Sequence, residues 1–420
     1  MAGEVRDPGL WSHYVAYMKA ALALIGKHEI ERREHPNAFW LVVRLFEPLQ
    51  KLPEFQAFHA HMVSSSLGES AFVDAGGNPI REPESQSHWL MNFYMMPILT
   101  AYIGPDLMLD FDECLAKAVY TDLEASLECT QAVYSVVAPL QHFEGPDQEV
   151  ELDATMALRR LSEDEIQHFW HLGEFGGIVE RSQTLSMSSC LATCVVTERN
   201  APTNLSEVHG RVWRVVTALR LLKSGQVGVP AVIQRLREPA FGLPGGTVGT
   251  SGPSPAALGP SYTLLPEESE PLIAMCRALA KAASAEHLRV PLRRFNYAYE
   301  RTRPEDRLID HWVALEALFL PDISQELSFR ASLRIAYYVA GTPDEREEVF
   351  RKMRLSYDTR SDVVHGQRLK ADVSEVASDT EEILRRALRA EVVNPGSLNV
   401  DRLDAAIARG QGAAQSGGAR

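Results

Sequence analysis

A series of helices with clear start and stop signals occupies the last third of this sequence. From residue 271 onward, apolar residues recur at helical spacing, and Gly, Pro or capping residues interrupt them at short intervals. The predicted helices are 271–284, 288–300, 302–320, 325–340, 343–365, 374–390 and 400–409. Because helices with short connections pack against their neighbours, we expect an antiparallel bundle over residues 271–408. The tail, residues 410–420, is rich in Gly, Ala and Ser and is expected to be disordered.

The clearest helix-end signals flank the helix predicted at 343–365. Thr342 is a suitable N-cap with a Glu three residues later, and Pro343 suits the first helical position. Gly366 is typical of the position just beyond a helix C-terminus. The same capping-box spacing at 302–305 predicts the start of the preceding apolar helix.

The first 265 residues carry weaker and more mixed signals. A chain of 420 residues exceeds the usual size of one core, so two or more domains are expected. Alternating or β-branched stretches predict strands at 149–158 and 186–197. The predicted helices of this region are 14–25, 39–46, 112–136, 162–172 and 208–222. We therefore expect residues 1–265 to form an α+β region dominated by helix, and the whole chain to be mainly α.

Residues 242–261 are rich in Gly, Pro, Ser and Thr, which predicts a mobile surface loop. The run from Gly245 to Gly249 shares its glycines with phosphate-binding loops, but no Gly-Lys-Ser/Thr ending follows it. We therefore assign no phosphate-binding loop to this stretch.

Charge, cysteine content and hydropathy exclude several classes of protein. The net charge of −14 makes the chain a poor non-specific binder of nucleic acid, so an RNA site needs a local concentration of basic residues. Five cysteines at low density do not indicate a disulfide framework. The sequence shows no signal-peptide pattern and no apolar run of about 18 residues. We therefore expect a cytoplasmic protein with no membrane partner.

One group of side chains has metal-ligand spacing. Glu165, His168 and His171 are three residues apart along one predicted helix. A solvated face of an amphipathic helix explains the same spacing, and we favour that interpretation. We accordingly predict no metal and no other cofactor.

One short stretch near the end of the longest predicted helix holds Arg360 and, five positions later, His365. Five residues of α-helix correspond to about 140° of rotation and about 7.5 Å of rise. The two side chains can therefore share a site only through the reach of Arg360, through the helix end, or across a two-fold dimer interface. Tyr357, Ser361 and His365 lie on one face at i, i+4 spacing, and Asp362 is placed to orient the imidazole.

An Arg and a His together suit metal-independent cleavage of RNA. Attack by the 2′-OH needs proton transfer, which His supplies near neutral pH, and a cation for the phosphoryl charge, which Arg supplies. Basic residues also outnumber acidic ones between residues 346 and 370. The alternative interpretation is structural: Arg360 pairs with Glu316, and His365 caps the helix end, where the helix dipole favours it.

Parts of the C-terminal third resemble the Apea-like branch of the HEPN superfamily. The similar segments, in matching order and spacing, are residues 307–319, 326–336 and 355–366. The resemblance implies a four-helix bundle core with additional helices, commonly paired into a homodimer. It also implies that Arg360 and His365 match the Arg-x4–6-His element, the proposed ribonuclease site. Many members have Asn after the Arg, whereas this chain has Ser361, which can bond phosphate with less reach.

Glu316 lies within an apolar helical stretch, where a buried carboxylate needs a partner. Arg330, Arg334 and Arg360 are the candidate partners. We expect Glu316 and Arg334 to support the site rather than to take part in the chemistry.

The sequence supports two functional hypotheses. In the first, suggested by the resemblance, the bundle is a metal-independent ribonuclease in a toxin, stress or phage-defence setting, and residues 1–265 sense a trigger or restrain it. In the second, the bundle is a non-catalytic dimerisation scaffold in which Arg360 binds a nucleotide phosphate or a regulatory partner. A solvent-open groove shared by two copies of Arg360 and His365 favours the first hypothesis, and burial of both side chains favours the second.

Overall fold

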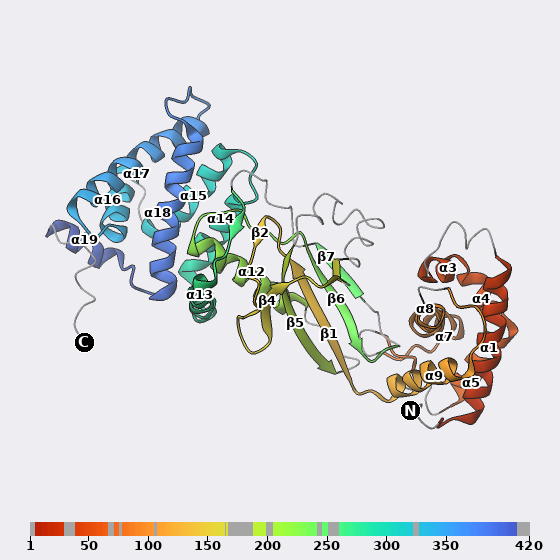
Figure 1. Ribbon diagram of the computed structural model, residues 1–420. Coiled ribbons are helices and arrows are strands. Elements are labelled where there is room, and N and C mark those ends of the chain that lie inside the picture. Colours follow the sequence, from red (N-terminus) through yellow and green to blue (C-terminus); the bar gives the residue numbers. More distant parts are fainter. Residues whose placement is uncertain are drawn as a thin grey trace. The chain divides into compact units, whose positions relative to one another are not determined.

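The described part of the chain is mainly helical, as predicted, and its strands precede a helical C-terminal region (Figure 1). The computed structural model describes residues 5–28, 38–65, 71–74, 78–104, 107–163, 165–166, 188–198, 205–241, 246–250, 260–321 and 327–409. It separates into two compact units, and the division passes within the four strands β1 (Gln131–Pro139), β5 (Ser189–Glu198), β6 (Ala231–Glu238) and β7 (Gly246–Thr250).

The first unit comprises Met1–Val136, Thr193–Asn204 and Ile233–Val248. Its helices are α1 (Pro8–Lys27), α3 (Ala38–Arg44), α4 (Phe46–Gln50), α5 (Pro53–Ser64), α7 (Pro83–Leu90), the π-helical turn η1 (Met91–Met95), α8 (Met96–Ile103) and α9 (Glu113–Glu128). Their apolar faces enclose one core that includes Tyr14, Tyr17 and Phe55. The helices predicted at 14–25 and 39–46 are confirmed within this set.

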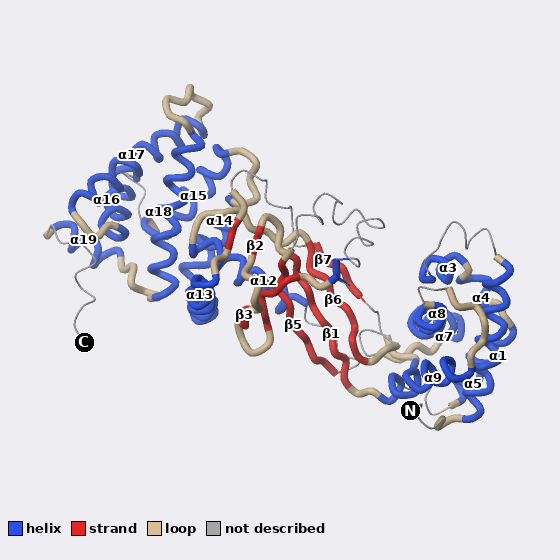
Figure 2. Tube along the Cα trace, viewed as in Figure 1, coloured by secondary structure: helices blue, strands red, loops and turns tan. Residues whose placement is uncertain are grey.

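Six strands form one sheet in the order β3-β4-β5-β1-β6-β7 (Figure 2). Their bounds are β1 (Gln131–Pro139), β3 (Val150–Glu151), β4 (Met156–Arg160), β5 (Ser189–Glu198), β6 (Ala231–Glu238) and β7 (Gly246–Thr250). Two further short strands, β2 (Phe143–Glu144) and β8 (Tyr262–Thr263), pair in parallel. The strand predicted at 186–197 corresponds to β5.

Three sequence predictions in this region were wrong in part. The helix predicted at 112–136 ends at Glu128, and β1 follows, because its β-branched residues suit a strand held between two neighbours. The strand predicted at 149–158 is a hairpin of β3 and β4, turned where Asp153 Oδ1 accepts the backbone N–H of Thr155. Within the loop predicted at 242–261, β7 pairs with β6.

The second unit comprises Val137–Ala192, Leu205–Val232 and Gly249–Arg420. Its helices are α12 (Leu205–Leu222), the short η2 (Pro266–Glu268), α13 (Ser269–Ala282), α14 (Glu286–Ala298), α15 (Pro304–Phe319), α16 (Leu327–Val339), α17 (Pro343–Val364), α18 (Val373–Val393) and α19 (Val400–Ala408). Helix α15 packs against α14, α17 and α18, while α16 packs against α17 and α19. Helix α12 packs against α13 and α18, so the C-terminal unit begins earlier than the predicted boundary near residue 265.

Local signals explain several helix starts. Thr342 Oγ1 accepts the backbone N–H of Glu345 at 3.2 Å, which confirms the predicted N-cap of α17. Asp372 caps α18 in the same way. The capping box predicted at 302–305 is wrong: α15 is capped by Arg303 without a side-chain hydrogen bond, and Pro304 takes the first helical position.

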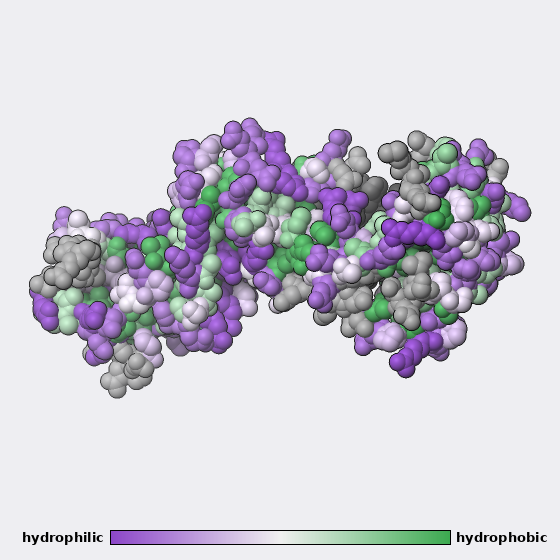
Figure 3. Space-filling model, turned by 90° about the horizontal axis from the view of Figure 1, so that it is seen from below, coloured by the Kyte–Doolittle hydropathy of each residue, from purple (hydrophilic) through white to green (hydrophobic). Residues whose placement is uncertain are grey.

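Most of the surface seen in Figure 3 is hydrophilic, with smaller apolar areas between the polar side chains. No helix in the described ranges is both long and apolar enough to cross a bilayer.

Candidate functional site

The last turn of α17 places His365 at the helix C-cap. Gly366 follows with φ of +63°, a left-handed conformation that glycine adopts without strain. The backbone N–H of Gly366 donates to Val363 O, and that of Gln367 donates to Asp362 O at 2.8 Å. These two bonds form a Schellman motif, which satisfies the last carbonyl groups of the helix. The predicted end of the helix at Gly366 is therefore confirmed.

Arg360 lies one turn and a half before that end and faces α15. Its Nη2 lies 3.6 Å from Glu316 Oε1, and the two side chains are 24% and 27% exposed. The guanidinium also lies 5.9 Å from the ring centre of Tyr357. Its Nε is buried without a hydrogen-bond partner among the described residues. The Arg360–Glu316 ion pair of the structural interpretation therefore forms. It does not use the Nε–H of Arg360, which can still donate a hydrogen bond.

The ring of Tyr357 packs against buried side chains of the bundle. Its ring meets the ring of Trp312 edge to face at 5.0 Å. Trp312 is fully buried and donates through Nε1 to Ser356 Oγ at 2.8 Å, and Ser356 bonds Thr380 on α18 at 2.6 Å. A chain of contacts across α15, α17 and α18 therefore fixes the face of α17 that carries Arg360.

His365 is exposed, and its ring has no described bonding partner. Ser361 and Asp362 are half-buried, and the described residues show no hydrogen bond from Asp362 to the imidazole. They also show no hydrogen bond or ion pair between Arg360 and His365. The chain thus presents the two predicted catalytic groups from α17 and its C-cap without joining them.

Two predictions about supporting residues need correction. Glu316 is about a quarter exposed rather than buried, because it lies at the edge of the α15–α17 contact. Arg334 does not pair with Glu316: it donates to Phe319 O at 2.7 Å and to Asp404 on α19. Arg334 therefore belongs to the α16–α19 contact rather than to the Arg360 site.

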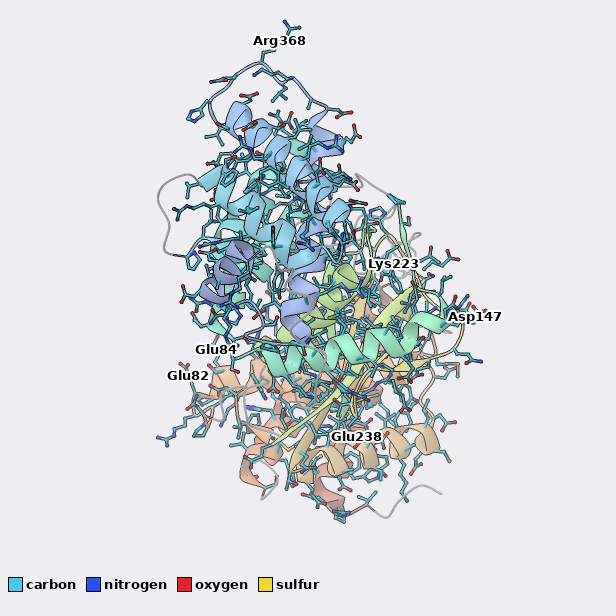
Figure 4. The ribbon with its side chains drawn as sticks, turned by 90° about the vertical axis from the view of Figure 1, so that its left-hand side faces the viewer. Glu82, Glu84, Asp147, Lys223, Glu238 and Arg368 are labelled. Carbon is cyan, nitrogen blue, oxygen red and sulfur yellow. The ribbon has the colours of Figure 1, made fainter. Side chains whose placement is uncertain are left out.

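The loop after α17 adds exposed positive charge. Arg368 and Lys370 are exposed, and Arg368 points away from the helices at the loop tip (Figure 4). On α17 itself Arg351 is exposed, whereas Lys352 is paired with Glu348 and Asp379. The positive charge predicted for residues 346–370 is thus partly neutralised by ion pairs along α17, whereas the basic side chains of the loop after α17 are exposed to solvent.

A buried cluster around Glu381 was not predicted. Tyr299 OH donates to Glu381 Oε1 at 2.8 Å, Arg307 Nη2 donates to Oε2 at 2.6 Å, and Arg385 Nη2 also donates to Oε1. Arg385 Nε donates to the backbone oxygen of Arg220 on α12 at 2.8 Å. Burial opposes ionisation of Glu381, yet the surrounding charges lower its pKa. The cluster ties α12, α15 and α18 together through one ionised carboxylate.

A second buried carboxylate, Glu391, organises the connection after α18. It is fully buried, and its pKa is lowered, because burial is outweighed by its hydrogen bonds. Within the described residues its donors are His287 Nε2, Tyr338 OH, Ser397 Oγ and the backbone N–H groups of Gly396 and Leu398. These bonds are structural, since they fix the loop between α18 and α19.

His311 on α15 is fully buried beside the Glu381 cluster. Neither of its ring nitrogens has a hydrogen-bond partner among the described residues, and Nε2 lies 4.0 Å from Glu381 Oε2. Burial lowers the pKa of His311 to about 4. His311 is therefore neutral near pH 7 and is the buried group most sensitive to acid in this cluster.

This burial predicts a loss of stability in mild acid. The unfolded chain takes up a proton at His311 near pH 6.5 and the folded chain near pH 4, so protonation favours unfolding as the pH falls between those values. We expect the wild-type free energy of unfolding to fall by about 2 kcal/mol more than that of His311→Gln between pH 7 and pH 5. Urea unfolding at both pH values measures this difference, and equal losses in the two proteins would contradict it.

The described residues hold no group of three or more His, Cys, Asp or Glu side chains that could bind a metal ion. Glu165 instead accepts hydrogen bonds from Arg159 and from the N–H of Ser162, and its own N–H donates to Ser162 Oγ; these reciprocal bonds form a capping box at the start of the helix predicted at 162–172. His168 and His171, the other members of the weighed metal set, lie outside the described residues.

Comparison with known proteins does not assign this chain to a family. No protein-family model, no curated protein and no solved structure matches this chain. The resemblance to the HEPN superfamily therefore rests on the residues of the C-terminal third themselves.

Proposed function

We propose that this protein is a metal-independent endoribonuclease whose site forms at the C-terminal end of α17. One observation carries the proposal: a guanidinium with an unbonded Nε lies five residues before an exposed imidazole at a helix end. The exposed Arg368 and Lys370 extend this site with positive charge in a chain that is acidic as a whole. The resemblance of the same residues to the HEPN element points to the same chemistry.

The chemistry would proceed through the ribose. The imidazole of His365 accepts the proton of the 2′-OH, whose oxygen attacks the phosphorus while Arg360 binds the non-bridging oxygens. The bond to the 5′ oxygen breaks, and that oxygen takes a proton from an imidazolium or from water. The products are a 2′,3′-cyclic phosphate and a 5′-hydroxyl, and no metal takes part in these steps.

The proposal includes a homodimer. Because Arg360 and His365 are about 140° apart around α17, a second copy is the simplest source of the matching group. A mixture of Arg360→Ala and His365→Ala chains tests this: reassociated mixed dimers recover part of the activity when the two groups act across the interface. Mixed dimers without activity would limit the site to one chain.

The direct test is cleavage of RNA by the purified full chain. The protein is incubated with mixed RNA in EDTA, and the 3′ ends of the products are analysed for cyclic phosphate. Cyclic ends produced in EDTA support the proposal. Intact RNA, or cleavage that requires a divalent ion, would overturn it.

Glu316 should act as a displaceable counter-ion for Arg360. The 3.6 Å ion pair is longer than a hydrogen bond, and RNA phosphate competes with the carboxylate for the guanidinium. We expect Glu316→Gln to tighten binding of a 2′-O-methylated RNA by about 2–5-fold, the range for a partly exposed ion pair. Fluorescence anisotropy measures the affinity, and such RNA cannot react through its 2′ oxygen.

The matched control for this prediction is Glu347→Gln. Glu347 is exposed on α17, so its replacement changes the net charge equally without touching Arg360. Equal tightening by both variants would show that only net charge matters and would remove the assigned role of Glu316.

The Arg360–Glu316 ion pair also supports a second candidate function. An Arg already neutralised in its own chain suits a binding site better than a catalytic one. The bundle would then be a non-catalytic scaffold that binds a nucleotide phosphate or a partner protein. Binding of 2′-O-methylated RNA that depends on Arg360, together with no cleavage of unmodified RNA, would identify this function.

A further inference from the structure

A pocket of about 370 Å³ lies between α16 and α19. Its volume falls near the lower end of the range of small-molecule sites, roughly 300–1,000 Å³. The lining includes Phe329, Leu333 and Arg334 from α16 and Asp404, Ile407 and Ala408 from α19. A ligand of this pocket must therefore fit both an ion pair and a group of apolar side chains.

Arg334 is almost completely buried, and all three nitrogen atoms of its guanidinium donate to other parts of the bundle. Its side chain is 6% exposed. Nε and Nη2 donate to the two carboxylate oxygens of Asp404, and Nη1 donates to Phe319 O at 2.7 Å. Because the N–H groups of a guanidinium lie in its plane, these bonds fix the orientation of that plane. Arg334 therefore presents a rigid planar group to the pocket.

The pair formed by Arg334 and Asp404 carries no net charge. Arg334 holds the pKa of Asp404 below its usual value, so this carboxylate is ionised near neutral pH and balances the guanidinium. A charged head group placed beside this pair would lose its hydration without gaining an uncompensated counter-ion. The pair therefore favours an uncharged ligand.

Phe329 supplies an aromatic ring to the lining. The ring meets that of Phe350 on α17 edge to face at 5.7 Å, yet Phe329 remains 50% exposed. Leu333 and Ile407 are half-buried and add aliphatic surface to the same pocket. A planar aromatic body suits this lining, because such a body can stack both on a phenyl ring and on a guanidinium plane.

We propose that the pocket between α16 and α19 binds an uncharged small molecule with a planar aromatic body. The aromatic rings stack on Phe329 and on the guanidinium plane of Arg334, and the rest of the body contacts Leu333 and Ile407. The volume of the pocket limits the body to about two fused rings. This binding is independent of RNA cleavage, because Arg360 and His365 line no part of the pocket.

An uncharged dye with a naphthalene ring, N-phenyl-1-naphthylamine, tests the proposal with the full chain. Its fluorescence rises in apolar surroundings, and we expect saturable binding of one dye per chain. Variants of the same carbon skeleton then compete with the dye. The planar, uncharged competitor is 1-naphthol, its saturated counterpart is decahydro-1-naphthol, and 1-naphthalenesulfonate adds an anionic group to the planar rings.

The order of the competitors identifies the class of ligand. We expect 1-naphthol to displace the dye at a concentration about 3–10-fold lower than the saturated alcohol, the size expected for an aromatic stacking contact. The sulfonate should need a concentration about tenfold higher than 1-naphthol, because Asp404 already balances Arg334. No saturable binding of the dye, equal displacement by the two alcohols, or displacement by the sulfonate as strong as that by 1-naphthol would overturn the proposal.

Removing the aromatic ring of the lining provides the second measurement. Phe329→Leu keeps an apolar side chain but loses the ring, and it should lower the affinity for the dye about 3–10-fold. The matched control is Tyr297→Leu, which removes a 40% exposed aromatic ring from α14 and should leave the affinity unchanged. Equal losses in the two variants would reject the role of Phe329.

Filling the pocket locates the dye. Ala408→Trp places an indole in the lining and should lower the affinity for the dye about tenfold or more. Because Ala408 is exposed at the end of α19, this variant should fold. Val393→Trp adds an indole at an exposed position of α18 and should leave the affinity unchanged. Unaltered binding in folded Ala408→Trp would place the dye elsewhere and reject the site.

Discussion

His365→Ala should lower the rate of RNA cleavage in EDTA by about 10²–10⁴-fold, the usual contribution of a general acid–base group. The imidazole is exposed at the helix end and bonds no described residue, so its loss should leave the fold intact. Initial rates on a labelled RNA, with circular dichroism as a check on folding, measure the effect. Wild-type activity in the variant would exclude His365 from the chemistry and end the nuclease proposal.

Two control variants separate the loss of a catalytic group from the loss of charge or of any histidine. Arg351→Ala removes an exposed positive charge from α17, and His209→Ala removes a half-buried histidine from α12. Both should cleave at nearly the wild-type rate. Arg360→Ala should lose about 10²–10³-fold, the size expected when a transition-state charge partner is removed. A loss in Arg351→Ala as large as that in Arg360→Ala would show an effect of general electrostatics.

The helices of the C-terminal third could be predicted because their signals are local. Thr342 acts on a backbone N–H three residues away, and Gly366 acts on carbonyl groups within the last turn. Such signals are fully present in the sequence. The ends of α17, and hence the position of His365 at a helix terminus, followed from them.

The strands were harder to predict because neighbouring strands decide them. Residues 131–136 have helical spacing by themselves, but they form β1 between β5 and β6. Gly246–Thr250 has the composition of a loop, yet it pairs with β6 as β7. The partners of β1 and β7 are supplied by tertiary structure, which overrides local preference.

The candidate site was predicted in its residue types and only partly in its contacts. The ion pair between Arg360 and Glu316 was one of several pairings that the sequence allowed, and only the packing of α15 on α17 selects it. Arg334 bonds Asp404 instead, because α16 packs against α19. Whether Arg360 and His365 meet across two chains stays a prediction, which the mixed-dimer experiment tests.

Only one pair of the Glu381 cluster, Glu381 and Arg385 at i,i+4 spacing, is local in the sequence. The other two donors, Tyr299 and Arg307, are separated from Glu381 by 82 and 74 residues. Charged residues on amphipathic helices usually face solvent, so nothing in the pattern distinguished this carboxylate from an exposed one. Its burial depends on the joint packing of α12, α15 and α18.

Glu381→Leu should therefore cause the largest loss of stability, about 3–5 kcal/mol in the free energy of unfolding. Arg307 and Arg385 are largely inaccessible to solvent, and both donate to this carboxylate. The replacement therefore leaves two guanidinium charges without their counter-ion. Urea unfolding of the full chain at pH 7, followed by tryptophan fluorescence, measures the change. Glu382→Leu is the matched control: Glu382 also pairs with Arg385, but it is 56% exposed and should cost less than about 1 kcal/mol.

A double variant distinguishes an uncompensated charge from lost packing. One explanation for destabilisation by Glu381→Leu is that it leaves the buried Arg385 guanidinium without a counter-ion. In that case adding Arg385→Met should restore part of the stability, since it removes the charge while keeping an unbranched side chain. Adding Arg385→Met to the wild type should instead be destabilising, because Glu381 loses a donor and the contact with Arg220 O is broken. Opposite signs of the same substitution in the two backgrounds would establish Glu381 and Arg385 as a coupled pair that locks α12 onto the C-terminal helices. Losses that simply add would mean that the cluster contributes no more than its separate side chains.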